Sequence, residues 1–261
     1  MPFLFAAAAR RQKKQVVAAA ICGDTSPFLR LMVHRLAWFR VGELKKLFQY
    51  FRQNGIRDVV MAGQVSPHRL FDRDVRMDEE FRDLFLALQN RKADTIFSAV
   101  ADKLKINGME LLDSTLLFQD YLARPGTLTK RGPSESELAD IDFGQKMAKV
   151  MGGLDVGQTV VVKDKAVVAI EAMEGTDRCI IRGGRIVHSD AVVVKMSKPR
   201  QDFRFDVPVI GPRTIQTMRR VKAGCLGIEA GKTLVIHEEK CVDLANKAKI
   251  TIVSTPSVYD S

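Results

Sequence analysis

The segment Gln15-Val-Val-Ala-Ala-Ala-Ile-Cys22 is a near-continuous apolar run that ends at Gly23. A run of this length with no alternating polar residues is typical of a strand buried on both faces of a parallel sheet. Asp58–Met61 has the same character and opens into Ala62-Gly63-Gln64. Shorter strands are expected at Ala37–Val41 and Met109–Leu112.

Helical patterns separate these runs. Leu44, Leu47, Phe48 and Phe51 recur at helical spacing, and Asn54-Gly55 is a good C-terminal stop. Further helices are predicted at Pro2–Lys14 and Ala93–Leu104. Because strands alternate with helices, the first part of the chain is predicted to be a parallel-sheet, Rossmann-like α/β domain with right-handed crossovers.

The pattern breaks at Ala123-Arg124-Pro125-Gly126, which places a domain boundary between residues 1–124 and 125–261. Beyond it, Ser134 and Glu137 form a capping box that predicts a helix to about Val150. The remaining elements predict a mixed α/β domain. They are a hairpin of Val156–Val162 and Ala166–Glu171, strands at Ala191–Met196, Lys232–His237 and Ile250–Val253, and helices at Pro212–Lys222 and Lys240–Lys247.

Composition narrows the class of protein. The 261 residues are 46% hydrophobic and 28% charged, which excludes a disordered chain, a collagen-like fibre and a disulfide-stapled miniprotein. No apolar run approaches the roughly 20 residues of a membrane-spanning helix, so we expect a cytosolic protein. The net charge of +10 favours an anionic partner, which leaves nucleic acid, a phosphate-bearing substrate and an acidic membrane face open.

The most polar stretch inside an apolar region runs from Glu171 to Arg178 and follows a predicted strand. Its carboxylates, Glu174 and Asp177, lie beside Gly175 and Thr176, a pattern that suits a hard cation or a phosphate, with Arg178 as a fork-shaped donor. The same residues are also ordinary in a hairpin loop with solvated charges, and the local pattern leaves both interpretations open.

A second cluster follows the next predicted strand. Lys195, Lys198 and Arg204 surround Asp206, and Gly211 precedes a predicted helix start. Basic side chains beside a helix start make a phosphate site reasonable. Asp206 stands between Phe205 and Val207, so it is either a salt-bridge partner or a sheltered metal ligand or base.

A third candidate is the loop that begins at Gly63. Ligands gather outside the carboxyl ends of strands in open α/β sheets, so we expect ligand contacts there. The residues concerned are Gly63, Gln64, Ser66, His68 and Arg69.

Several longer stretches then resemble one family. Leu154–Lys163 and Val168–Asp177, which includes Glu174-Gly-Thr-Asp177, closely resemble the UDP-2,3-diacylglucosamine pyrophosphatases of lipid A synthesis, the type unrelated to calcineurin-like phosphoesterases. The likeness covers nearly the whole chain. It extends to Val59–Gly63, Arg131-Gly-Pro-Ser134, Arg204-Phe-Asp206-Val-Pro208 with Gly211, Pro212 and Thr214, and Gly227-Ile-Glu229-Ala-Gly231.

The resemblance implies two α/β domains that hold a UDP-linked diacylated sugar lipid between them, and Mg²⁺-dependent hydrolysis to UMP and the acylated sugar 1-phosphate. It implies that Asp206 binds Mg²⁺ or positions the water, with Glu174 and Asp177 as further metal ligands. Lys195 and Arg204 would hold phosphate oxygens. Substrate contacts are expected from the remaining candidates, namely Gly63, Gln64, Ser66, Arg69, Thr176, Arg178, Lys198, Gly211 and Thr214.

Two features depart from the family pattern. Family members open with a strand and a glycine-rich loop, so a first domain without its first strand is expected here. Gln64 also stands where a lysine is usual. An inactive lipid- or nucleotide-binding descendant is therefore the alternative to the enzyme. We further expect transient docking on the cytosolic face of the inner membrane and no nucleic-acid partner, and a homodimer stays open.

Overall fold

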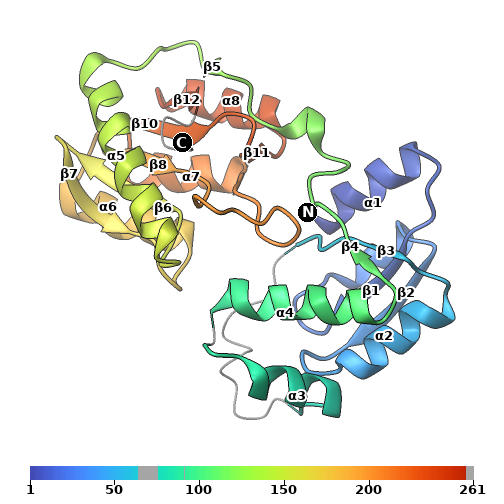
Figure 1. Ribbon diagram of the computed structural model, residues 1–261. Coiled ribbons are helices and arrows are strands. Elements are labelled where there is room, and N and C mark those ends of the chain that lie inside the picture. Colours follow the sequence, from blue (N-terminus) through green and yellow to red (C-terminus); the bar gives the residue numbers. More distant parts are fainter. Residues whose placement is uncertain (64–75, 91, 257–261) are drawn as a thin grey trace. The chain divides into compact units, whose positions relative to one another are not determined.

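The computed structural model describes residues 1–63, 76–90 and 92–256. The chain divides into two compact units. The first comprises Met1–Phe118 together with Asp202–Asp206, and the second comprises Gln119–Gln201 and the chain from Val207 onward. Each unit contains strands and helices (Figure 1), which confirms the prediction of two α/β domains.

Among its described residues, the first unit contains two separate pairs of parallel strands. β1 (Val17–Ile21) pairs with β2 (Arg35–Phe39), and β3 (Asp58–Val59) pairs with β4 (Glu110–Leu111). The parallel direction agrees with the sequence prediction. The helices of this unit are α1 (Pro2–Arg11), the 3₁₀ helix η1 (Pro27–Leu31), α2 (Leu44–Gln53), α3 (Glu79–Ala87) and α4 (Ala93–Ile106).

The core of the first unit is formed by three helices and β4. Phe48 and Phe51 of α2 pack with Phe81 of α3 and Leu104 of α4. These are the apolar positions that helical spacing turns toward one face. At the start of α1, Pro2 lies against Gly63, whose φ of +127° favours glycine.

The second unit is built on a six-stranded mixed sheet in the order β5-β12-β10-β8-β6-β7. Its central strands β12, β10 and β8 are parallel, and β6, β7 and β5 join antiparallel. A separate parallel pair joins β9 to β11. The bounds are η3 (Gln119–Tyr121), β5 (Gly126–Thr127), α5 (Glu135–Gly153), β6 (Thr159–Lys163), β7 (Ala166–Ile170), α6 (Thr176–Val187), β8 (Val192–Lys195), β9 (Val209–Ile210), α7 (Pro212–Arg220), β10 (Cys225–Glu229), β11 (Leu234–Val235), α8 (Glu238–Lys247) and β12 (Thr251–Thr255).

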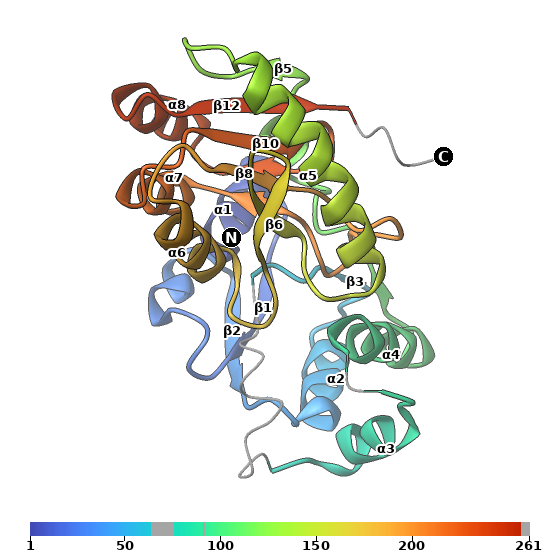
Figure 2. The ribbon, with the colours of Figure 1, turned by 90° about the vertical axis from the view of Figure 1, so that its left-hand side faces the viewer.

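Helices cover both faces of this sheet. α5 lies on one face, and α6, α7 and α8 lie on the other (Figure 2). Val160 and Val162 pack toward α5, whereas Val161 between them packs toward α6. Both faces of β6 are therefore apolar, which explains its uninterrupted run of valines.

Seven of the described elements were not predicted from the sequence, namely η1, α3, η3, β5, α6, β9 and β10. In α6, Gly183-Gly184 is typical of a turn, yet a Cβ at Gly183 would lie 2.7 Å from Val161 Cγ1. In β10, a Cβ at Gly227 would lie 3.1 Å from Ile141 of α5. Both glycines therefore allow close packing of a helix on the sheet and mark no chain reversal.

Candidate functional site

A buried lysine marks the carboxyl end of β8. Lys195 is 7% exposed and is the last residue of that strand. Its Nζ donates to Thr176 Oγ1 at 3.0 Å and to Thr159 Oγ1 at 3.3 Å. A cation buried this deeply needs nearby acceptors, because desolvation otherwise favours the neutral amine.

Glu171 lies beside this lysine. Thr176 Oγ1 donates to Glu171 Oε1 at 2.8 Å, and Glu171 Oε2 lies 3.7 Å from Lys195 Nζ. Glu171 Oε2 is buried and accepts no hydrogen bond from the described residues. Glu171 directly follows β7, and Lys195 is the last residue of β8. The ends of these two strands therefore bring opposite charges together.

The same place is the start of α6. Gly175 precedes the helix with a φ of +82°, and a Cβ there would meet no atom within 4 Å. The backbone N–H groups of the first helical turn carry the positive end of the helix dipole, which favours anions. A buried cation, paired with Glu171, therefore lies beside a helix N-terminus at the carboxyl end of β8.

Glu174 and Asp177, the predicted metal ligands, are engaged by arginines. Arg182 Nη2 donates to Glu174 Oε1 at 2.7 Å, and this hydrogen bond lowers the pKa of Glu174. Arg213 Nε lies 2.6 Å from Asp177 Oδ2. Arg178 is exposed on the first turn of α6. Among residues 1–63, 76–90 and 92–256, no three His, Cys, Asp or Glu side chains group to hold a metal ion.

Asp206 belongs to the first unit, although it comes from the second half of the chain. Ser114 N donates to Phe203 O at 2.9 Å, and Ser114 Oγ lies 2.7 Å from Arg204 O. The ring of Phe205 stacks on Phe97 with 5.5 Å between centroids. These contacts hold the segment that ends at the half-buried Asp206.

Arg204, predicted to hold a phosphate, forms a fork with Asp202. Arg204 Nε lies 2.9 Å from Asp202 Oδ1, and Nη2 lies 2.6 Å from Oδ2. The pair raises the pKa of Arg204 and lowers that of Asp202. A phosphate at Arg204 would compete with this carboxylate or share the arginine's remaining donors.

The other predicted contacts lie in separate places. Lys198 Nζ lies 2.6 Å from Asp155 Oδ1. Gly211 precedes α7, where its N–H donates to Thr214 Oγ1 at 3.5 Å. Gly63 follows β3 in the first unit. Gln64, Ser66, His68 and Arg69 lie outside the described residues.

Sequence reasoning missed a second buried ionic group in the second unit. Glu229, which is fully buried at the end of β10, lies 2.9 Å from Lys149 Nζ of α5 and 3.2 Å from Lys232 Nζ. Ser197 donates to the same carboxylate. Both buried ionic groups have the same sequence signal, a charged residue directly after an apolar run. Lys195 ends β8 in this way, and Glu229 ends β10.

Comparison with known proteins gives concordant results. The LpxI N-terminal domain model matches residues 1–121, and the LpxI C-terminal domain model matches residues 124–253. A protein of Caulobacter vibrioides, the UDP-2,3-diacylglucosamine pyrophosphatase LpxI, is 33% identical over 218 residues, which cover 79% of this chain and 77% of the relative. The resemblance found in the sequence is thereby confirmed, and the chain belongs to the LpxI family.

Proposed function

We propose that the protein hydrolyses the pyrophosphate bond of UDP-2,3-diacylglucosamine and releases UMP and 2,3-diacylglucosamine 1-phosphate. Family membership and the printed activity of the Caulobacter relative support this proposal. The observation that carries it is the direct contact of buried Lys195 with Thr176, the first residue of α6. A phosphate bound there would meet both Lys195 and the N-terminus of α6, and it would compete with Glu171 for the lysine.

Electrostatics explain why such a point suits a diphosphate. Attack on phosphorus spreads negative charge over the phosphoryl oxygens, so catalysis consists mainly of neutralising charge and orienting the nucleophile. Lys195 sits in a low-dielectric surrounding, where its attraction for a phosphate is stronger than in water. The phosphate would take the place of Thr176 and Thr159 as acceptors for Lys195.

We assign Asp206 to position the attacking water or to bind Mg²⁺, with Glu174 and Asp177 as further ligands. Mg²⁺ commonly uses one or two carboxylates together with phosphate oxygens and water. The ion would therefore take its remaining ligands from the diphosphate and from water. Bound Mg²⁺ would neutralise charge on the diphosphate. Removal of divalent cations with EDTA should stop UMP release, and added Mg²⁺ should restore it.

The decisive variant is Asp206→Ala. We expect it to release no UMP while its circular dichroism and melting temperature match the wild type. Asp142→Asn, an exposed residue of α5 paired with Lys146, is the matched control and should keep full activity. UMP release by Asp206→Ala would refute the assignment. Binding of substrate without any UMP release by the wild type would favour the alternative, a binding protein descended from the family.

We also propose that the protein visits the cytosolic face of the inner membrane, because the acyl chains of this substrate reside in a bilayer. The part of the chain that the structure describes has no helix long and apolar enough to cross one. The net charge of +10 supports reversible attraction to anionic lipid.

A further inference from the structure

We propose that η1 and β2 form the surface by which the protein docks on anionic lipid. We call it the η1 surface and define it by Phe28, Leu31 and Trp38 with Arg30. The η1 surface rests on the membrane association proposed above and assigns that association to specific residues. The positions of these residues do not depend on whether the protein hydrolyses the substrate.

Two large apolar side chains project from η1. Phe28 is 69% exposed and Leu31 is 77% exposed, whereas Leu29 between them is 5% exposed. Residues three apart eclipse one another in a 3₁₀ helix, so Phe28 and Leu31 extend on the same side while Leu29 anchors the turn. Such paired exposure is costly in water and is typical of a surface that meets an apolar partner.

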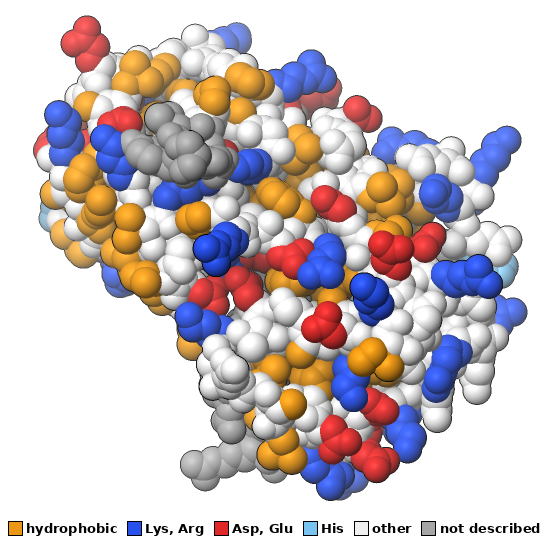
Figure 3. All heavy atoms as spheres, in the orientation of Figure 1, with side chains coloured by type: hydrophobic (Ala, Val, Ile, Leu, Met, Phe, Trp, Pro, Cys, Tyr) orange, Lys and Arg blue, Asp and Glu red, His pale blue; other side chains and the backbone are white. Residues whose placement is uncertain are grey.

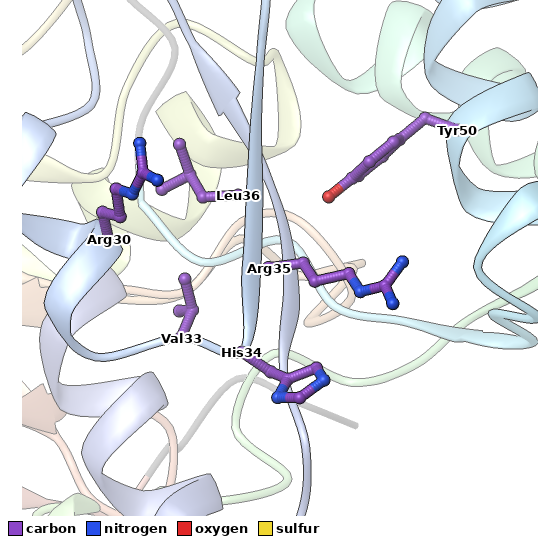
Figure 4. A pocket seen from close by; sticks show the side chains of 6 residues that line it. All are labelled: Arg30, Val33, His34, Arg35, Leu36 and Tyr50. Atoms are coloured by element: carbon purple, nitrogen blue, oxygen red, sulfur yellow. The ribbon is translucent and has the colours of Figure 1, made fainter.

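Trp38 of β2 adds an interfacial side chain. It is 43% exposed and is the only tryptophan of the chain. Side chains alternate along a strand, so Trp38 shares a face with Leu36, while the ring of Phe39 lies 5.5 Å from that of Tyr50 of α2. Figure 4 shows Leu36 on the same side of β2 as Arg30 of η1, away from Tyr50. Tryptophan favours the boundary between headgroups and acyl chains.

Cations are dense in this part of the sequence. Between residues 10 and 40 the sequence holds seven Lys and Arg and one acidic residue, Asp24. The cations, all exposed, are Arg10, Arg11, Lys13, Lys14, Arg30, Arg35 and Arg40. Blue side chains gather along the margin of the molecule where α1 and β2 lie (Figure 3). Each cation near an anionic bilayer strengthens binding roughly fivefold.

Backbone pairing brings two of the basic segments together. Val16 O accepts from both His34 N and Arg35 N, so Lys13 and Lys14 precede the point where β1 meets β2. Arg30 and Arg35 also line one open cavity of about 420 Å³, together with Val33, His34, Leu36 and Tyr50 (Figure 4). Arg35 extends on the opposite side of β2 and donates to Asn54 Oδ1 at 2.9 Å. Arg30, on the side of Leu36, is therefore the guanidinium that suits a lipid phosphate with its acyl chain alongside.

The apolar start of the chain serves a different purpose. Phe5 of α1 packs edge-on against Phe118 at 5.9 Å between centroids, and Ala6, Ala8 and Ala9 are buried. This part of α1 therefore contributes to the core of the first unit. The exposed side chains of Phe28, Leu31 and Trp38 lie instead on η1 and β2.

Vesicle binding tests the proposal. The wild-type protein is sedimented with phosphatidylcholine vesicles with and without phosphatidylglycerol, at low and high salt. Quenching of Trp38 fluorescence by brominated lipid measures insertion. We expect binding only to the anionic vesicles, weakened by salt, with quenching of Trp38. The double variant Phe28→Ser/Leu31→Ser should lose at least tenfold in affinity. Arg30→Glu should lose severalfold.

Matched controls come from the same unit. Leu86 and Ile106 are 77% and 79% exposed, so Leu86→Ser/Ile106→Ser removes equal apolar exposure elsewhere. This control should bind vesicles as the wild type does. The proposal is overturned if the control loses as much as the η1 variant, if the η1 variant binds normally, or if Trp38 is not quenched. A dimer that the η1 variant dissociates, or oligonucleotide binding that it abolishes, would assign the surface to another partner and also overturn it.

UMP release from detergent-dispersed substrate separates this proposal from the proposed function. The η1 variant should release UMP at the wild-type rate, because its substitutions lie outside the assigned site. Anionic vesicle binding by a protein that releases no UMP would leave the η1 surface standing and refute the enzyme. Normal UMP release without vesicle binding would support the enzyme and refute the η1 surface.

Discussion

The backbone N–H and the hydroxyl of Ser197 both donate to Glu229 Oε2, at 2.7 and 2.6 Å. Lys149 Nζ lies 2.9 Å from the other carboxylate oxygen. Burial opposes ionisation of Glu229, but Ser197 and Lys149 outweigh it and lower its pKa. The connection that leaves β8 is thus fixed at Ser197, just before Lys198 and the segment that carries Asp206.

Glu229→Gln should destabilise the protein severely. The substitution keeps the shape but removes the buried counter-charge of Lys149, a change that costs about 3–5 kcal/mol. Urea unfolding followed by circular dichroism measures the effect. Glu239→Gln, at an exposed position of α8, should stay within about 0.5 kcal/mol of the wild type. A wild-type midpoint for Glu229→Gln would contradict the importance of this ion pair.

Lys195→Met should reduce kcat/KM by about 100-fold or more, because it removes a donor aimed at the proposed phosphate position. Since Glu171 would then lack its cation, the double variant Glu171→Gln/Lys195→Met checks that any loss reflects lost chemistry and not misfolding. Lys146→Met on exposed α5 is the control. Full activity of a folded Lys195→Met protein would remove Lys195 from the site.

Acid should weaken the start of α5. Burial of Glu137 favours its neutral form, but hydrogen bonds from Arg131 and Ser134 prevail and lower its pKa from 4.5. A depressed folded-state pKa contributes stability above 4.5, and this contribution disappears as the pH falls through the folded value. The stability difference between wild type and Glu137→Gln should therefore shrink below pH 4.5. A difference that stays constant would disprove the linkage.

The β6–β7 hairpin offers a stabilising change. Asp164 and Lys165 have φ of 50° and 58°, and their N–H groups donate to Asp140 of α5 at 3.1 and 2.6 Å. Because a left-handed conformation strains lysine, Lys165→Gly should raise the unfolding free energy by about 1 kcal/mol. Asp140→Ala should lower it by about 1–3 kcal/mol. Both values follow from denaturant titration, and a destabilised Lys165→Gly protein would contradict the turn geometry.

Thiol reactivity should single out one cysteine. Burial raises the pKa of Cys179 and Cys225 to about 12 and that of Cys241 to about 11. Cys22 is only partly buried. Because the thiolate is the reactive form, one thiol should react with Ellman's reagent in the native protein and all four in denaturant. Cys22→Ser should abolish the fast reaction. Rapid labelling of Cys225 would show that the sheet opens readily.

Strands and helix caps could be predicted from the sequence where a short local pattern determines the structure. The valine run of β6 and the Ser134–Glu137 capping box were both predicted, and the structure confirms them. α6 and β10 were missed because Gly183 and Gly227 serve contacts with residues remote in sequence. Glycine is interpreted locally as a turn, so only the packing partner reveals its purpose.

The candidate site divides in the same way. The polarity of Glu171–Arg178 identified Thr176, which Lys195 contacts. Nothing in the local pattern indicates that Arg182 and Arg213 engage Glu174 and Asp177. Those partners lie further along α6 and on α7, so their approach depends on how the helices pack. An ion pair between side chains on two different elements therefore leaves no recognisable pattern in the local sequence.

Asp202–Asp206 is encoded with one half of the chain and packs with the other. A chimera that joined residues 1–121 of this protein to the second segment of a relative would place a foreign loop against Ser114 and Phe97. The segment that matches the N-terminal family model therefore does not contain the whole of the first unit, because residues 202–206 complete it from the other half of the chain.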